Sequence, residues 1–207
     1  MEGILEKLLL GEALRGDMVI LEYSSLTPVE KTAWGKLVPL LKANGNLVIT
    51  DFFGVGDALF RKYLRRLPGK TYSEFVELVK DVKVIKIGPG ATTYGDILDE
   101  IVPTYDPHIF LKNYHAVMSR ISRLPQKPKF LMSFGLSHYA RFNPDGALKS
   151  IITAVTNIPM EDLIGVHLVN RDIISRENLA VFEEIATFVL DISDTEVRIL
   201  KDGGIGD

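Results

Sequence analysis

Residues 16–36, GDMVILEYSSLTPVEKTAWGK, join an apolar strand, a short polar turn and the start of a helix. A phosphate-binding loop has this geometry, and its pattern G-x-x-x-x-G-K-[ST] falls on residues 25–32, SLTPVEKT. Both glycines of the pattern are missing, whereas Lys31 and Thr32 occupy the lysine and magnesium-ligand positions. The stretch therefore predicts the start of a fold and leaves the chemistry open.

Apolar runs typical of strands covered on both faces alternate with helical patterns along the rest of the chain. We expect strands at 18–23, 46–53, 82–87, 130–136 and 163–169, followed by a hairpin of 188–192 and 196–200. We expect helices at 2–10, 27–43, 57–67, 71–81, 107–123, 143–157 and 176–186, while residues 91–105 show no clear pattern. This order predicts an α/β fold with three α-β-α layers and a mostly parallel central sheet.

Capping signals mark several of the expected helix starts. Thr27–Glu30 and Thr71–Glu74 match the capping box, in which a hydroxyl and a carboxylate satisfy the first free amides of a helix. Asp106 and Ser175 are expected to cap the helices that follow them.

Composition limits the classes of function. The chain has 207 residues and a formal net charge of −3, which favours one domain over residues 1–207 and disfavours nucleic acid as a partner. No cysteine is present and the four histidines are scattered, so we expect no metal site. We expect a cytoplasmic protein with no targeting peptide and no membrane span, an N-terminal helix within residues 1–15 and a flexible tail at 202–207.

Four phrases carry a resemblance to a known family: VILEYSS at 19–25, LVITDFF at 47–53, DVKVIKIG at 81–88 and EEIATFVLDIS at 183–193. The chain resembles the RecA-like ATPases, in particular the single-domain KaiC-like ones, over nearly its whole length. It is more specifically similar to a family of uncharacterised RecA-like proteins from hyperthermophilic archaea, catalogued as a domain of unknown function. The resemblance implies a P-loop NTPase-like core with a C-terminal β-hairpin, and self-association into dimers or rings.

Three parts of the ATPase machinery depart from the family pattern. Glu30 replaces the glycine beside the lysine, and Pro28 removes an amide donor from the loop. A carboxylate about 5 Å from a triphosphate charge costs roughly 3 kcal/mol at an effective dielectric of about 20. Ser133 stands where the Walker B aspartate is expected, and Asp51, at the position of the first catalytic glutamate, is followed by Phe52. The same residues also suit structural roles, with Lys31 as a solvated helix residue and Asp51 as a turn or cap.

The carboxyl ends of parallel strands meet at one rim, where ligands of such sheets bind. Residues 137–141 follow the fourth strand and form either a recognition loop or an ordinary helix start, and His167 in an apolar strand is expected to be a hydrogen-bonded core residue. The candidate ligand-binding residues on the rim are Ser24, Ser25, Lys31, Thr32, Asp51, Ser133, Ser137, His138 and Arg141.

These observations favour a RecA-like binding or regulatory module that has lost ATP hydrolysis, is not an enzyme and holds no cofactor. A peptide, a partner protein or a second copy of the chain is its expected partner. One alternative is an NTPase with an altered phosphate loop, which would use ATP and magnesium through Lys31, Thr32 and Asp51. A second alternative is a DNA-binding relative of the recombinases.

Overall fold

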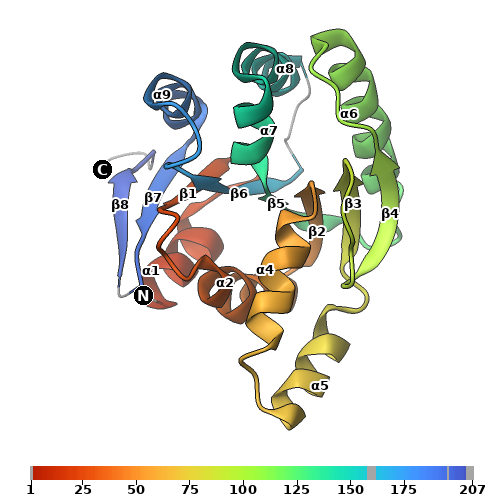
Figure 1. Ribbon diagram of the computed structural model, residues 1–207, viewed down its shortest axis with the longest axis vertical. Helices are drawn as coiled ribbons and strands as arrows, with labels where there is room; N and C mark the ends of the chain where they lie inside the picture. The colour runs from red at the N-terminus through yellow and green to blue at the C-terminus, as the bar shows by residue number, and fades with distance from the viewer. Residues whose placement is uncertain (1, 158–161, 195, 204–207) are drawn as a thin grey trace.

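A computed structural model describes residues 2–157, 162–194 and 196–203 of the chain. One eight-stranded sheet runs through the molecule in the order β4-β3-β2-β5-β6-β1-β7-β8, and every neighbouring pair is parallel except β7 and β8 (Figure 1). The strands are β1 Met18–Tyr23, β2 Asn46–Phe52, β3 Lys83–Ile87, β4 Asp96–Ile101, β5 Pro128–Phe134, β6 Ile164–Asn170, β7 Phe188–Ile192 and β8 Val197–Lys201. The predicted three-layer α/β architecture and closing hairpin are confirmed.

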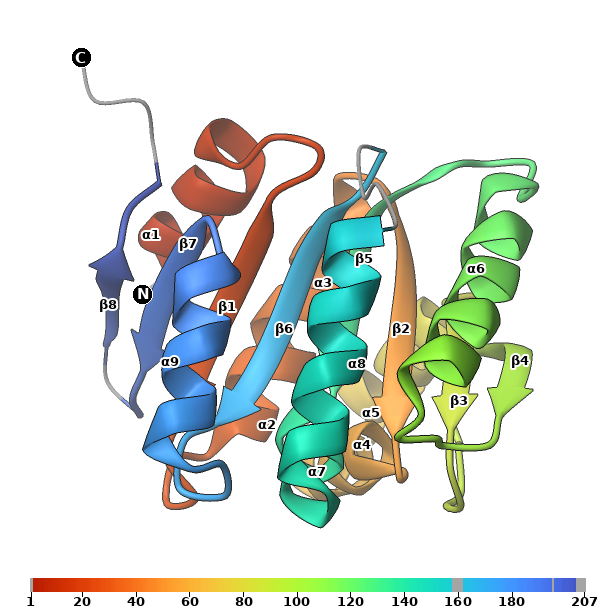
Figure 2. The same cartoon turned by 90° about the horizontal axis from the view of Figure 1, so that it is seen from above.

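Helices cover both faces of the sheet. One layer contains α1 Glu2–Lys7, α2 Val29–Thr32, α3 Val38–Ala43, α4 Val55–Leu64 and α5 Gly69–Val79, with π-helical turns at Leu8–Glu12 and Ala33–Leu37. The other contains α6 Pro107–Ser122, α7 Leu136–Phe142, α8 Pro144–Asn157 and α9 Arg176–Ile185 (Figures 1 and 2). The first layer packs on one large apolar cluster, whereas the apolar side chains under the second layer divide into two separate clusters.

Strand β1 lies inside the sheet, as the sixth of its eight strands. It pairs on one side with β6, from Met18–Gly165 to Tyr23–Asn170, and on the other side with β7. Its residues 19–23 are all buried, as expected for a strand with a helical layer on each face. The loop that follows β1 therefore opens at the rim between the ends of β6 and β7.

Strand β4 falls in residues 91–105, where the sequence shows no apolar pattern. It forms an exposed edge of the sheet and pairs in parallel with β3. Cross-strand ion pairs accompany this pairing: Lys83 Nζ lies 2.5 Å from Asp96 Oδ2 and Lys86 Nζ lies 3.3 Å from Glu100 Oε2. Charges suit an edge strand because they discourage pairing with other chains.

Both predicted capping boxes are wrong, and so is part of the fourth strand. Helix α2 begins after Pro28 and α5 begins after Pro68, and neither helix has a side-chain cap. Strand β5 ends at Phe134, and Gly135, with φ +77°, turns the chain directly into α7. The caps at Asp106 and Ser175 are confirmed, since each side chain accepts amide hydrogen bonds from its helix.

Two other expectations concern the ends of the chain and the membrane. Most of the tail expected to be flexible, residues 204–207, lies outside the described residues. Within the described ranges, no helix has both the length and the hydropathy to cross a bilayer.

Candidate functional site

The β1–α2 loop, residues 24–28, stands where a phosphate loop would lie, and two of its amide hydrogens are bonded to protein oxygens. Ser25 N donates to Asp172 Oδ2 at 2.7 Å, and Thr27 N donates to the Ser24 carbonyl at 3.0 Å. The amides of residues 29 and 31 donate to the carbonyls of residues 27 and 28. Because Pro28 has no amide hydrogen, this loop presents few donors to an anion.

Glu30 does not cap its helix. Its side chain is fully buried, with 0% of the residue exposed, and it forms one ion pair with α4 and one with the turn that follows α4. Lys62 Nζ lies 3.0 Å from Oε2, and Arg66 Nη1 lies 3.1 Å from Oε1. Glu30 therefore links α2 to α4. The repulsion of a triphosphate that the sequence predicts for Glu30 is weakened, since both cations offset its charge.

The two residues that match the end of the phosphate-loop pattern point in different directions. Lys31 is exposed, and its Nζ lies 3.6 Å from Asp194 Oδ1 in the β7–β8 turn. Thr32 is buried within α2. The arrangement of Lys31 corresponds to the solvated helix residue that the sequence leaves as an alternative.

Asp51, at the end of β2, is fully buried and holds the start of α4. Its carboxylate accepts hydrogen bonds from Gly56 N at 2.7 Å, Asp57 N at 3.0 Å and the Tyr94 hydroxyl at 3.1 Å. Burial raises the pKa of Asp51 to about 6, although these three hydrogen bonds and the nearby Asp57 charge act in opposite directions on it. All the described partners of this carboxylate are structural, and its geometry is that of a helix cap.

A hydrogen-bonded network joins three segments of the rim. Ser25 Oγ lies 3.2 Å from Asn170 Nδ2, and Asn170 N donates to Ser137 Oγ at 2.6 Å. Asp172 completes the network through the Ser25 amide. The structure thus brings Ser25 and Ser137 together, and it adds Asn170 and Asp172, which the sequence places on the rim but which are not among the candidate ligand-binding residues. A polar residue at the end of a buried strand, as at Asn170, was the available signal.

Residues 137–141 lie within helix α7. Of the two alternatives for this segment, the helix start is therefore the one that the structure shows, and the segment is not a loop. Ser24 Oγ lies 3.2 Å from Thr27 Oγ1 within its own loop. His138 is half-buried, which lowers the pKa of its imidazole, and Arg141 is exposed near the end of the helix. The rim candidates therefore include both buried and exposed groups.

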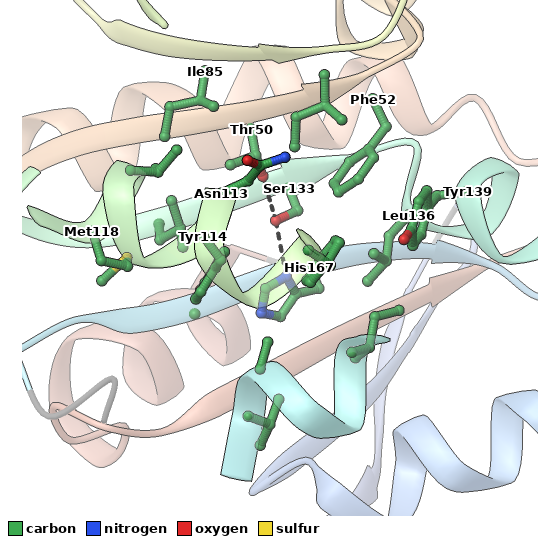
Figure 3. Close-up of a pocket in the computed structure, with 18 of the residues that line it drawn as sticks. Thr50, Phe52, Ile85, Asn113, Tyr114, Met118, Ser133, Leu136, Tyr139 and His167 are labelled. Atoms are coloured by element: carbon green, nitrogen blue, oxygen red, sulfur yellow. Dashed lines mark hydrogen bonds between the residues drawn. The ribbon is translucent and has the colours of Figure 1, made fainter. Parts of the chain in front are cut away.

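Ser133 faces away from the β1–α2 loop, into the layer of α6–α9. It forms a polar row with residues in register on the neighbouring strands, Thr50 on β2 and His167 on β6. Thr50 Oγ1 donates to Ser133 Oγ at 2.6 Å, and Ser133 Oγ lies 3.0 Å from His167 Nδ1 (Figure 3). His167 is hydrogen-bonded as predicted, and burial lowers its pKa to about 4, so its ring is neutral near pH 7.

This polar row lies on the floor of a cavity of about 250 Å³ between the sheet and helices α6 and α8. The walls are mainly apolar, and the cavity lies between the two apolar clusters of this face. Asn113 lines the cavity from α6, and Figure 3 shows its side chain directed toward the sheet. Lining residues Val102 and Val155 are exposed, so the cavity reaches the surface.

Comparison with known proteins assigns the family. The family model described as "Pyrococcus protein of unknown function, DUF257" matches residues 8–202. The chain belongs to this DUF257 family. A structurally characterised protein of Pyrococcus horikoshii OT3 is 22% identical with a TM-score of 0.78, over 98% of this chain and 93% of that chain. No curated protein matches the chain.

The flagellar accessory protein FlaH of Methanocaldococcus jannaschii shows the same fold with more divergence. It is 15% identical, with a TM-score of 0.52 over 100% of this chain and 88% of that chain. Together with the mostly parallel sheet, this similarity shows that the DUF257 chain has a RecA-like fold.

The residues present do not fit a magnesium–ATP complex of the kind that this fold implies. The loop amides donate to protein oxygens, and Ser133, at the Walker B position, faces the opposite layer. Within the described residues, no cluster of three histidine or carboxylate side chains could hold a metal ion.

Proposed function

We propose that this DUF257 chain is a cytoplasmic RecA-like binding or regulatory module that does not hydrolyse ATP. The observation that carries the proposal is the closed hydrogen bonding of the β1–α2 loop. Two amides of the loop, those of residues 25 and 27, and two at the start of α2, those of residues 29 and 31, donate to protein oxygens. A phosphate group would have to break several of these bonds to obtain the donors that a phosphate loop offers freely.

The Ser25–Asp172 hydrogen bond joins the loop to a distant segment of the chain. It ties the loop to the segment after β6, which lies 147 residues away in the sequence. Opening the loop would remove the Ser25 amide from the Asp172 carboxylate, which is exposed and would repel an incoming anion. The rim therefore suits a partner with hydrogen-bond donors and acceptors, such as a peptide, a protein surface or a second copy of the chain.

Calorimetric titration with ATP and magnesium, combined with a phosphate-release assay, tests the proposal. We expect no binding at ligand concentrations up to about 1 mM, which corresponds to a binding free energy weaker than about −4 kcal/mol. The matched variants are Lys31→Ala and Lys70→Ala, which remove exposed lysines from α2 and α5. Micromolar binding with turnover that only Lys31→Ala abolishes would establish the NTPase alternative and overturn the proposal.

A further inference from the structure

The cavity beneath α6 and α8 interrupts an otherwise close-packed layer. Protein interiors contain few voids larger than a water molecule, and an unfilled cavity costs stability. Three polar side chains in register, Thr50, Ser133 and His167, occupy its floor where apolar residues would pack. We propose that the cavity binds a small, uncharged, mainly aliphatic molecule whose carbonyl oxygen accepts a hydrogen bond from His167 Nε2. This inference does not depend on the state of the β1–α2 loop, because no residue of that loop lines the cavity.

The direction of the hydrogen bonds on the floor selects an acceptor. Thr50 Oγ1 donates to Ser133 Oγ at 2.6 Å, a shorter contact than the 3.4 Å to the Met132 carbonyl. Ser133 then has its own proton to donate to His167 Nδ1, 3.0 Å away. A neutral imidazole that accepts at Nδ1 carries its proton on Nε2. No protein acceptor for Nε2 is found among the described residues, so this donor is available to a ligand.

A glycine keeps space beside this donor. Gly165 lies two residues before His167 on β6 and also lines the cavity. A Cβ atom at Gly165 would lie 2.8 Å from His167 Nε2, closer than such atoms normally approach. The side chain of any other residue would therefore clash with His167 Nε2, the atom that we propose donates a hydrogen bond to the ligand.

The charges around the cavity select an uncharged ligand. None of the described residues that line it is a lysine or arginine. The carboxylate that does line it, Asp17, accepts hydrogen bonds from Thr187 Oγ1 and Leu14 N. A ligand carboxylate would thus lose its water without meeting a cation, which is strongly unfavourable. Asn113 adds a polar group that can donate or accept without adding charge.

The volume sets the size of the ligand. An apolar cavity of about 150 Å³ accommodates benzene. The cavity here is about 250 Å³, which in proportion holds roughly ten non-hydrogen atoms. A ketone of eight carbons, 2-octanone, has the size and the single acceptor that the site requires.

Calorimetry on the full chain with 2-octanone, octane and octanoate tests the proposal at pH 8. We expect 2-octanone to bind with a Kd of about 1 mM or tighter, and octanoate not to bind over the same range. In His167→Leu the affinity for 2-octanone should fall about fivefold, the loss of one neutral hydrogen bond, while octane binding is retained. Nitrogen-15 NMR of the wild type should show the His167 proton on Nε2, and its signal should shift with 2-octanone.

Variants on α8 locate the binding. Ala154→Phe fills the cavity and should abolish 2-octanone binding, whereas Ile152→Phe, on the exposed side of the same helix, should leave it unchanged. If Ala154→Phe loses its circular-dichroism spectrum, Val155→Trp at the exposed edge of the cavity replaces it. The proposal is overturned by absence of 2-octanone binding, by tighter binding of octanoate, by a proton on Nδ1, or by undiminished binding in the blocked variant. The ATP titration decides none of these outcomes.

Discussion

The burial of the Glu30 carboxylate predicts that losing its two cations destabilises the protein more than losing the carboxylate itself. Glu30 is fully buried, while Lys62 and Arg66, the two cations that hold it, are about half exposed. Replacing Glu30 by Gln leaves two cations that water can reach. Replacing both cations by Met leaves a buried carboxylate with neither of its partners. The second change should therefore destabilise the protein more than the first.

The geometry gives the size of the difference. Each pair, at 3.0 and 3.1 Å, would contribute about 5 kcal/mol of Coulomb attraction at an effective dielectric of about 20. Burial of the carboxylate cancels several kcal/mol of this attraction, and exposure of the cations screens it further. We expect Glu30→Gln to lower the free energy of unfolding by about 1–2 kcal/mol, and the double change Lys62→Met with Arg66→Met by about 3–5 kcal/mol.

Urea denaturation followed by circular dichroism measures both values. Arg65→Met is the matched control, because Arg65 lies on the same helical segment, is exposed and should change stability by less than about 0.5 kcal/mol. The reasoning is refuted if Glu30→Gln costs as much as the double variant, or if the double variant matches the control.

Three further predictions concern buried groups. The pKa of Asp51 rises from 3.8 to about 6 on folding, so Asp51 stays protonated to a higher pH in the folded state than in the unfolded state. Protonation therefore stabilises the folded state, and this stabilisation is lost as pH rises. The free energy of unfolding should fall by about 2 kcal/mol as pH rises from 4 to 6; Asp51→Asn should flatten this slope in urea melts at several pH values. Gly135→Ala should cost more than about 2 kcal/mol, because φ is +77° and a Cβ would lie 2.5 Å from the Phe52 carbonyl oxygen; Gly69→Ala, with open space around it, should cost nothing measurable in the same assay. Trp34→Phe removes the 3.2 Å hydrogen bond to a backbone carbonyl and should lower the thermal midpoint by about 2–4 °C in calorimetry; an unchanged midpoint would show that this bond contributes nothing net.

Much of the fold is encoded in local patterns that the sequence displays. Continuous apolar runs such as Met18–Tyr23 predict buried parallel strands, and the caps at Asp106 and Ser175 act as their residue types suggest. The sequence does not predict strand β4 because acidic residues are uncommon in strands and give no alternating apolar pattern. Ion pairs with β3, which the sequence does not reveal, accompany this strand. The first capping box failed because buried ion pairs hold the carboxylate of Glu30, and the second failed because α5 begins at Gly69, before Thr71.

The candidate site was less predictable, since its parts depend on register between distant strands. Ser133 and His167 are each a single polar residue within an apolar run, and Thr50 precedes Asp51 at the end of another. Only the pairing of β2, β5 and β6 places them side by side on one face. The sequence assigned Ser133 to the rim because its position in the motif suggested it, whereas strand alternation turns it to the opposite face of the sheet from Asp51.

The position of β1 between β6 and β7 has a consequence for synthesis of the chain. Translation completes Met18–Tyr23 early, yet its neighbours β6 and β7 are made only after residue 163. At ribosomal rates of about 5–20 residues per second, the intervening 147 residues between Ser25 and Asp172 take roughly 7–30 s. During that interval an apolar strand with two unpaired edges protrudes from every translating ribosome. Nascent chains on one messenger thus present identical unpaired apolar strands to one another until about the last fifth of the protein emerges.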